Sequence, residues 1–505
     1  MKKIYYGLLI LLLSFCLFFT TGCKKNSEYI VIKYHILDVT TTHAYIELSE
    51  AAKYATKFLD LTVYVPEKDG NRKVTSVSFS SDCIHVSKIV LSKYINYING
   101  DILNDCKYLQ EIEVDKDNET YTSHKGVLFT KDKKELVYYP SYYQKYVSFR
   151  FPSEIEKIGD QAFYECETLI GITISSSIKY IGNEAFQGCK NLETVDFLSD
   201  SILENIGYEA FSNCDKLKSF NIPSKVNYIG DYAFSSCEQL SVVTFPDPCE
   251  ITAIGSGAFS HTAITSITIP NTITKIGSSA FSGCSELTNI IIDENSALNE
   301  IESDAFSDTA ISSIIIPDTV TKLGNGVFHN CFNLKEVKLP SSLTEIGSNL
   351  FSGCAIEEIE IPRTVKEIGW YAFSNCRNLK NINLPEGLEN IGAEAFSGCT
   401  SLTEVIIPNS VKELEESSFN GCSKLETVVL SDNIKYIYRQ TFYNCKNLKN
   451  ITIGSNLKEI HAKAFVSCNN LEEITYNGTE DQWKNVLIVE EGNNSILNAK
   501  VKYLK

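Results

Sequence analysis

The hydrophobic positions of the chain recur in a fixed phrase along most of its length. The phrase is an aliphatic residue and Gly, then Ala-Phe, then Cys, then a β-branched run ending in Pro, and residues 391–408 are one copy. Its phenylalanine occurs 14 times at steps of 22, 23 or 25 residues, at Phe163, Phe186, Phe211, Phe234, Phe259, Phe281, Phe306, Phe328, Phe351, Phe373, Phe396, Phe419, Phe442 and Phe465. Such a period indicates a repeat solenoid, in which each coil buries its apolar face against its neighbours.

The copy at residues 391–408 indicates the structure of one coil. Its β-branched run is a short strand, and Pro408 ends it because Pro lacks the N–H that a strand ladder needs. The Ile391-Gly392 pair ends a second extended stretch, where Gly permits a turn. The residues that share one face of a helical turn are Ala395, Phe396, Cys399 and Leu402. The sequence therefore predicts a solenoid of the leucine-rich-repeat type, with short strands, extended and helical-turn connections and a period of about 23 residues.

The phrase also predicts the domain organisation. We expect residues 84–475 to form the solenoid, with residues 115–150 inserted as a β-hairpin around the polar Lys131–Lys134 segment. Residues 23–83 are expected to be a linker and N-terminal cap, and residues 476–505 a C-terminal cap, because a solenoid needs its open ends covered.

The first residues have the pattern of a secretory signal. Lys2 and Lys3 precede an apolar run, Ile4–Phe19, and Thr20-Thr21-Gly22-Cys23 follows. The ending resembles a bacterial lipobox, although Thr20 stands where an aliphatic residue is usual. This predicts a signal peptide at residues 1–22 and a lipid on Cys23, which would tether a secreted protein to the bacterial surface, on the outer membrane if the cell has two membranes. The alternatives are plain secretion and an uncleaved anchor, for which the apolar run is short.

Units such as Ile391–Leu402 with Val405–Pro408 resemble the BspA-type leucine-rich repeat family of bacterial surface proteins. The resemblance covers roughly residues 84–480. It implies a solenoid, and it implies an adhesin or surface antigen that binds host matrix proteins or other cells.

Charge and candidate chemistry argue against several functions. The net charge of −17 repels phosphate backbones and so excludes nucleic acid as a partner. Cysteine follows the repeat phenylalanine by three residues in 12 of the 14 copies, which predicts a ladder of buried free thiols instead of a metal or catalytic site. Cys83 and Cys249 lie off this ladder and are exposed or paired. Because the seven histidines form no metal-binding motif, we expect no enzyme, metal or cofactor.

One row of residues is a candidate binding face. Strand side chains alternate, so the residue between the two inward aliphatic residues of each strand faces outward. The candidate residues are Thr244, Thr268, Ile291, Ile315, Lys338, Glu360, Asn383, Ile406, Val429 and Thr452. Exposed aliphatic residues in a polar row indicate anchors for a protein partner, although β-propensity alone also places Ile and Val in strands. The Tyr139–Tyr146 cluster is a second candidate patch, with packing of the hairpin as its alternative.

These observations favour a surface-tethered module that binds a protein or cell-surface ligand and meets the membrane only through its N-terminal lipid. The alternative is a structural or scaffold lipoprotein that contacts components of the cell envelope.

Overall fold

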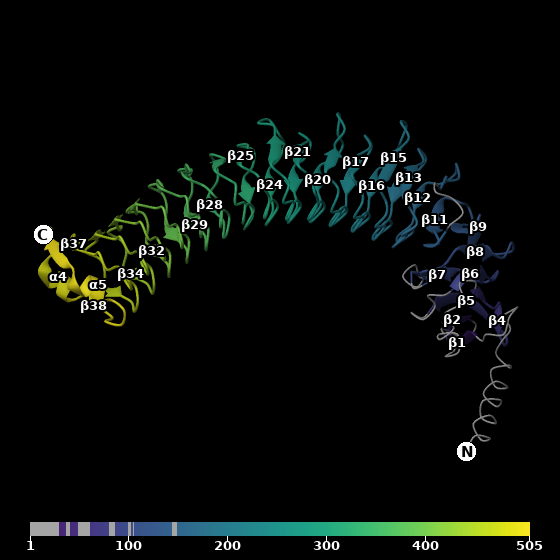
Figure 1. Cartoon of the computed structure of the whole chain (residues 1–505), viewed down its shortest axis with the longest axis horizontal. Coiled ribbons are helices and arrows are strands. Elements are labelled where there is room, and N and C mark those ends of the chain that lie inside the picture. Colours follow the sequence, from purple (N-terminus) through teal and green to yellow (C-terminus); the bar gives the residue numbers. More distant parts are fainter. Residues whose placement is uncertain are drawn as a thin grey trace, which may run out of the picture. The chain divides into compact units, whose positions relative to one another are not determined.

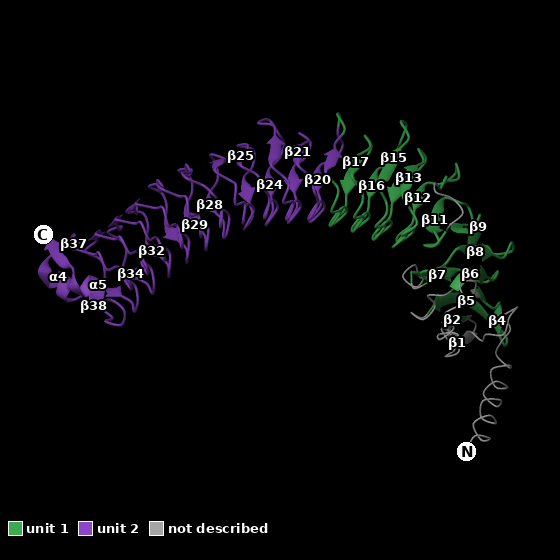
Figure 2. Cartoon of the chain, in the orientation of Figure 1, with its two compact units in different colours: residues 1–240, 246–248 green, residues 241–245, 249–505 purple. Residues whose placement is uncertain are grey.

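The computed structural model describes residues 30–36, 41–48, 61–79, 86–98, 103–104, 106–143 and 149–505. The chain forms a β-solenoid with a period of about 23 residues and little helix, which confirms the fold expected from the sequence. It divides into two compact units, coloured separately in Figure 2: unit 1 comprises residues 1–240 and 246–248, and unit 2 comprises residues 241–245 and 249–505. The expected signal peptide with Cys23, and also Cys83 and Tyr146, lie outside the described residues.

Unit 1 begins with a sheet that departs from the repeat. This sheet has the order β1-β2-β5-β4, with β7 also paired to β5. The strands are β1 (Ile30–Ile36), β2 (Thr41–Leu48), β4 (Lys68–Asp69), β5 (Arg72–Phe79) and β7 (Tyr97–Ile98). Parallel pairing of the repeat type joins β3 (Leu61–Tyr64) to β6 (Val86–Leu91) and β6 to β8 (Glu111–Val114). The stacked coils therefore extend N-terminal to residue 84.

The segment that interrupts the period in unit 1 contains three antiparallel strands. These are β9 (Tyr121–His124), β10 (Val127–Thr130) and β11 (Glu135–Tyr138), and the turn at Lys131–Lys134 joins β10 to β11. β11 then pairs in parallel with β12 (Lys157–Ile158), the first of the regular short strands. The insertion is thus continuous with the sheet that follows it.

Each regular coil contributes to two series of parallel strands, which lie side by side along the stack within each unit (Figure 1). The first series carries the β-branched run before Pro. In unit 1 it comprises β13 (Gly171–Ile174), β15 (Thr194–Phe197) and β17 (Ser219–Asn221). In unit 2 it comprises β19 (Val242–Thr244), β21 (Ser266–Ile269), β23 (Asn289–Ile292), β25 (Ser313–Ile315), β27 (Glu336–Lys338), β31 (Glu404–Ile406), β33 (Thr427–Val429), β35 (Asn450–Ile453), β37 (Glu473–Tyr476) and β39 (Lys500–Tyr503).

The second series consists of two-residue strands that precede the Gly position of the phrase. In unit 1 these are β12, β14 (Tyr180–Ile181), β16 (Asn205–Ile206) and β18 (Tyr228–Ile229). In unit 2 they are β20 (Ala253–Ile254), β22 (Lys275–Ile276), β24 (Glu300–Ile301), β26 (Lys322–Leu323), β28 (Glu345–Ile346), β29 (Glu367–Ile368), β30 (Asn390–Ile391), β32 (Glu413–Leu414), β34 (Tyr436–Ile437), β36 (Glu459–Ile460) and β38 (Leu487–Ile488).

The repeat phenylalanines form a stack in the core of each unit. In unit 1 the ring centroids of Phe163, Phe186 and Phe211 follow one another at 4.8 and 4.9 Å, with the planes within 13°. In unit 2 the distance is 5.4 Å between Phe373 and Phe396, whose planes differ by 1°. These spacings are close to the separation of neighbouring strands, about 4.8 Å. The side chains therefore repeat at the spacing of the backbone, and each ring is completely buried.

The connection that carries the phenylalanine is a series of turns with left-handed residues at two fixed positions. The residues two before and two after every repeat phenylalanine have positive φ, for example Glu394 at 55° and Gly398 at 74°. This conformation lets alternate amides reach the next coil: the N–H groups of Glu394, Phe396 and Gly398 donate to the carbonyls of residues 416, 418 and 420 at 2.7 to 3.0 Å. The backbone of the turn is thus hydrogen-bonded along the stack.

The Gly position of the phrase is explained by close packing of coils. A Cβ on Gly207 would lie 2.6 Å from the carbonyl carbon of Gly182, and one on Gly230 would lie 2.5 Å from that of Gly207. Real Cβ atoms do not approach so closely, and neither glycine has positive φ. Contact between coils, and not the freedom to turn, therefore selects glycine here.

Unit 2 ends with a segment that covers the last coil. β39 pairs in parallel with β37, and β38 with β36, while the short helices α4 (Glu480–Lys484) and α5 (Asn494–Asn498) connect them. Asn493 is completely buried between these elements. Its side-chain carbonyl accepts the N–H of Phe465 at 3.0 Å, and its amide donates to the carbonyls of His461 and Val489 at 2.8 and 2.7 Å. In other coils a backbone carbonyl of the next coil accepts the phenylalanine N–H, so Asn493 takes the place of a missing coil.

Candidate functional site

The outward row predicted from the sequence lies entirely in unit 2. The residues that the strand pairing brings opposite one another are Thr268 and Ile291, Ile315 and Lys338, Glu360 and Asn383, and the run Ile406, Val429 and Thr452. Thr244 occupies the same position in β19. The alternation of strand side chains thus places these residues on the outward side of the first series of strands. We call this side the first-series face of unit 2.

The aliphatic residues of the row are unequally exposed. Ile315, Ile406 and Ile291 have 63%, 57% and 48% of their surface accessible. Val429 and Thr452 are half-buried, and the polar members of the row from Thr244 to Asn383 are exposed. Three large apolar side chains therefore stand out on a face that is otherwise polar.

The row is interrupted by a groove that the sequence did not predict. A hollow of about 880 Å³ lies over the coil that contains Glu360, between β27 and the segment 381–385. Val337 of β27 lines the hollow and is half-buried, although the equivalent inward residues Ile314 and Val405 are buried. The groove therefore reaches side chains that belong to the core layer elsewhere.

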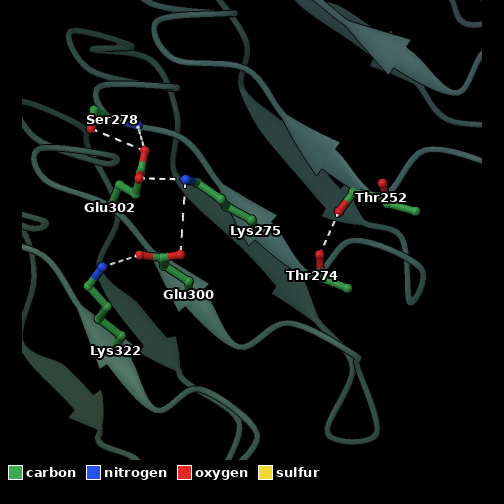
Figure 3. Close-up of polar contacts among 7 residues, drawn as sticks. All are labelled: Thr252, Thr274, Lys275, Ser278, Glu300, Glu302 and Lys322. Carbon is green, nitrogen blue, oxygen red and sulfur yellow. Dashed lines mark hydrogen bonds and ion pairs between the residues drawn. The ribbon is translucent and has the colours of Figure 1, made fainter.

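The second series of unit 2 carries a ladder of ion pairs, shown in Figure 3. Lys275 pairs with Glu302 at 2.6 Å and with Glu300 at 4.0 Å, and Lys322 also pairs with Glu300. The ammonium of Lys275 lowers the pKa of the Glu302 carboxyl from its usual value. Lysine and glutamate thus alternate from β22 to β26, and their charges are matched within the chain over these three strands.

The glutamates that replace Gly in the phrase have a definite role. Glu302 accepts hydrogen bonds from the N–H and hydroxyl of Ser278 in the preceding coil at 3.0 and 3.3 Å (Figure 3). Glu415 likewise accepts the N–H of Ala393 at 3.1 Å. Both carboxylates therefore bind a backbone amide that points along the stack.

The cysteine ladder consists of buried free thiols, as predicted, for the cysteines that the structure describes. From Cys189 onward, the ladder thiols donate to the carbonyl of the phenylalanine in the preceding coil, for example Cys399 to Phe373 at 3.1 Å. Where Thr262 replaces Cys, its hydroxyl bonds the carbonyl of Phe259 at 2.9 Å and lies 3.3 Å from the sulfur of Cys284.

Burial raises the pKa of these thiols, to about 11 for Cys166 and about 12 for Cys376. They are therefore protonated at neutral pH, when they serve as hydrogen-bond donors and not as nucleophiles. Cys249 is half-buried and free.

The tyrosine cluster packs as part of the hairpin region of unit 1. Tyr139 and Tyr143 are buried, with ring centroids 5.2 Å apart. Tyr139 stacks on Phe163 at 4.7 Å and so continues the phenylalanine stack. Tyr139 and Tyr143 therefore form part of the core, as expected if the cluster serves to pack the hairpin.

The described part of the chain contains neither a group of possible metal ligands nor a helix that could span a membrane. Within it, no three His, Cys, Asp or Glu side chains are grouped so that they could hold a metal ion. No helix in the same ranges has the length and apolar character needed to cross a membrane.

Comparisons with known proteins address the repeat directly. The sequence matches the family described as BspA type leucine rich repeat region at residues 62–131, 134–253, 252–380 and 366–487. A comparison with curated proteins gave no match.

Among solved structures, the chain is similar to a leucine-rich repeat protein from Bacteroides ovatus. The two are 25% identical, the alignment covers 95% of this chain and 100% of the other, and the TM-score is 0.55. A leucine-rich cell surface protein from Faecalibacterium prausnitzii is 19% identical over 92% of this chain and 97% of its own, with a TM-score of 0.34. The pneumococcal vaccine antigen PcpA is 17% identical over 96% of this chain and 99% of its own, with a TM-score of 0.42.

The family match spans most of the chain, and its repeat is the one that forms both the phenylalanine stack and the cysteine ladder. The chain belongs to the BspA-type leucine-rich repeat family.

Proposed function

We propose that the chain is a protein-binding module of the bacterial surface and that the first-series face of unit 2 receives its ligand. Membership of the BspA-type family supports a role in protein interaction at the cell surface. The observation that carries the assignment to this face is the exposure of Ile291, Ile315 and Ile406 among polar neighbours. Large apolar side chains surrounded by a polar rim are typical of residues that anchor protein interfaces.

The ligand we propose is a protein of the host matrix or of another cell, which makes the chain an adhesin. We also propose that Cys23 carries a lipid that holds the module at the membrane. Protease treatment of intact cells tests this orientation, because an adhesin is cleaved from outside. Protection of the protein on intact cells would instead favour a scaffold that faces the envelope.

The binding face is tested with the variant Ile291→Ser/Ile315→Ser/Ile406→Ser/Val429→Ser. The mature chain and the variant are compared for capture on immobilised matrix extract, and their thermal unfolding is measured in parallel. We expect capture to fall at least about tenfold with little change in unfolding, because the three isoleucines are exposed and Val429 is only half-buried, so none of the four belongs to the buried core.

The matched control changes exposed aliphatic residues outside the row. Leu487 and Leu504 are 59% and 55% exposed at the C-terminal end, so Leu487→Ser/Leu504→Ser removes similar apolar surface. The control should retain capture. Equal capture by the parent chain and the four-residue variant would rule out this face.

A further inference from the structure

The groove in unit 2 coincides with a one-residue deletion in the repeat. Only Ala355 separates Cys354 from Ile356, whereas two residues separate Cys399 from Leu402 in a regular coil. The shortened turn leads directly into the strand position at Glu358–Ile361. That segment forms an isolated bridge from Glu360 to Asn383 and is not a regular strand.

The deletion is accompanied by a break in the strand ladder. In neighbouring coils the N–H of Lys335 donates to the carbonyl of Ser312 at 2.9 Å, and that of Lys380 donates to the carbonyl of Glu357 at 3.0 Å. Across the described residues of unit 2, no backbone hydrogen bond joins 357–361 to 335–339, and β27 pairs with β25 alone.

On the side of β27 that has no partner strand, the free backbone groups are those of Val337. Glu336 donates its N–H to Ser312, and Lys338 accepts the N–H of Ile316, so both residues bond toward β25. Because successive residues of a strand bond to opposite sides, the N–H and C=O of Val337 face the groove. A strand edge of this kind is a template for pairing with another chain.

The floor and walls of the groove are partly apolar. Val337 and Leu384 stand on opposite sides of the hollow, and both are half-buried, whereas Ile407, the equivalent of Leu384, is buried. An extended segment in the groove would place alternate side chains against these two residues.

The rim of the groove is acidic. Glu336, Glu358 and Glu360 line it, and none of them forms an ion pair with any residue that the structure describes. Glu357 is already paired with Lys380 at 2.5 Å. Lys335 and Arg363 are the cations of the lining, so acidic side chains outnumber basic ones there. A segment that bears Lys or Arg complements this rim.

We propose that the groove binds an extended, basic segment of a protein partner, which adds to the free edge of β27 as an extra strand. Backbone hydrogen bonds to Val337 would hold the segment, its apolar side chains would cover Val337 and Leu384, and its basic side chains would meet the three glutamates. This inference rests on the proposed function, since it names the part of the ligand that the same face of unit 2 receives.

The experiment measures binding of a labelled peptide of alternating Lys and Val to the full mature chain by fluorescence anisotropy. A peptide of alternating Glu and Val tests the charge, and a Lys–Val peptide with methylated backbone nitrogens tests strand addition. We expect the Lys–Val peptide to bind saturably and both other peptides to bind at least about tenfold more weakly. Equal binding of the Glu–Val or the methylated peptide would overturn the proposal, as would the absence of binding by all three.

A one-residue insertion identifies the site. Adding Ser between Ala355 and Ile356 restores the regular spacing, and we expect the ladder to re-form and Lys–Val binding to fall at least about tenfold. The control insertion, Ser between Ala310 and Ile311, repairs a similar deletion ahead of β25 and should leave binding unchanged.

Charge variants test the same site without altering the backbone. Glu336→Gln/Glu358→Gln/Glu360→Gln should weaken binding, while the exposed control Glu286→Gln/Glu294→Gln/Glu416→Gln should not. If both charge variants bind the peptide as the parent does, or if the insertion at Ala355 has no effect on binding, the proposal is wrong.

Failure of this inference is distinguishable from failure of the proposed function. If the peptide does not bind but Ile291→Ser/Ile315→Ser/Ile406→Ser/Val429→Ser loses capture on matrix extract, the face stands and the groove assignment fails. If that variant keeps full capture while the peptide results hold, the groove stands and the assignment of the row fails.

Discussion

Substitution of Asn493 should loosen the C-terminal end of unit 2. Asn493→Ala leaves the buried N–H of Phe465 without its acceptor and the carbonyls of His461 and Val489 without their donor. A buried polar group that loses its hydrogen-bond partner lowers the free energy of unfolding by about 1–3 kcal/mol. The carbonyls of His461 and Val489 are less deeply buried than the N–H of Phe465, so they add less to this loss. We therefore expect the local free energy of unfolding to fall by about 3 kcal/mol, which corresponds to a roughly hundredfold increase in the population of the state in which this end is unfolded.

The loss should be local, because each coil of a repeat protein contacts only its neighbours. Trp483, whose ring centroid lies 5.0 Å from that of Tyr476, reports on this end when Trp370 is replaced by Phe. Urea unfolding followed by Trp483 fluorescence should shift to lower urea, and the amides of residues 459–476 should exchange faster with deuterium. The control is Asn470→Ala, which removes one exposed hydrogen bond to the carbonyl of Lys446. If Asn493→Ala and Asn470→Ala lower stability equally, the capping role assigned to Asn493 is refuted.

Three further predictions follow from the backbone and the thiols. Gly421→Ala should lower the free energy of unfolding by about 1 kcal/mol in urea titrations, since φ is 74° and the nearest atom to the added Cβ is 3.7 Å away, so only the backbone conformation opposes it. Gly398→Ala should cost more, because its Cβ would also lie 2.8 Å from the side-chain oxygen of Asn375; equal losses would contradict this reading. Raising the pH from 9 to 11 should destabilise the protein, because burial raises the pKa of Cys166 from 9.0 to about 11 and the unfolded thiol loses its proton first. Thermal unfolding measured across that pH range checks the sign, and the variant Cys166→Ser is the control. If stability depends on pH in the same way in both proteins, Cys166 does not contribute to the loss of stability.

The phenylalanine stack and the cysteine ladder could be predicted from the sequence because each is a column of one residue type at a constant period. The outward row followed from strand alternation in the same way. Val429 and Thr452 are nevertheless half-buried, and their strands, β33 and β35, lie between other strands of a continuous sheet.

Other features depend on how coils meet, which the period does not specify. The left-handed position before the phenylalanine is occupied by Gln161, Glu184 and Tyr232 among others, so no residue type marks it. The position after the phenylalanine is rich in Asn and Gly, and this signal could have revealed it. Asn493 lies 28 residues beyond Phe465 in a segment without the repeat, and only the folded chain brings the two together. The deletion at Ala355 is visible in the sequence, but its effect appears only in the hydrogen bonding of β27.

The most direct test of the central claim is covalent footprinting of the mature chain on beads coated with matrix extract, compared with blank beads. Carbene labelling marks exposed side chains, and mass spectrometry locates the marks. If the first-series face of unit 2 binds the ligand, Ile291, Ile315 and Ile406 lose their label on the coated beads while Leu487 keeps it. Full labelling of the three isoleucines on the coated beads, with protection elsewhere, would contradict the claim.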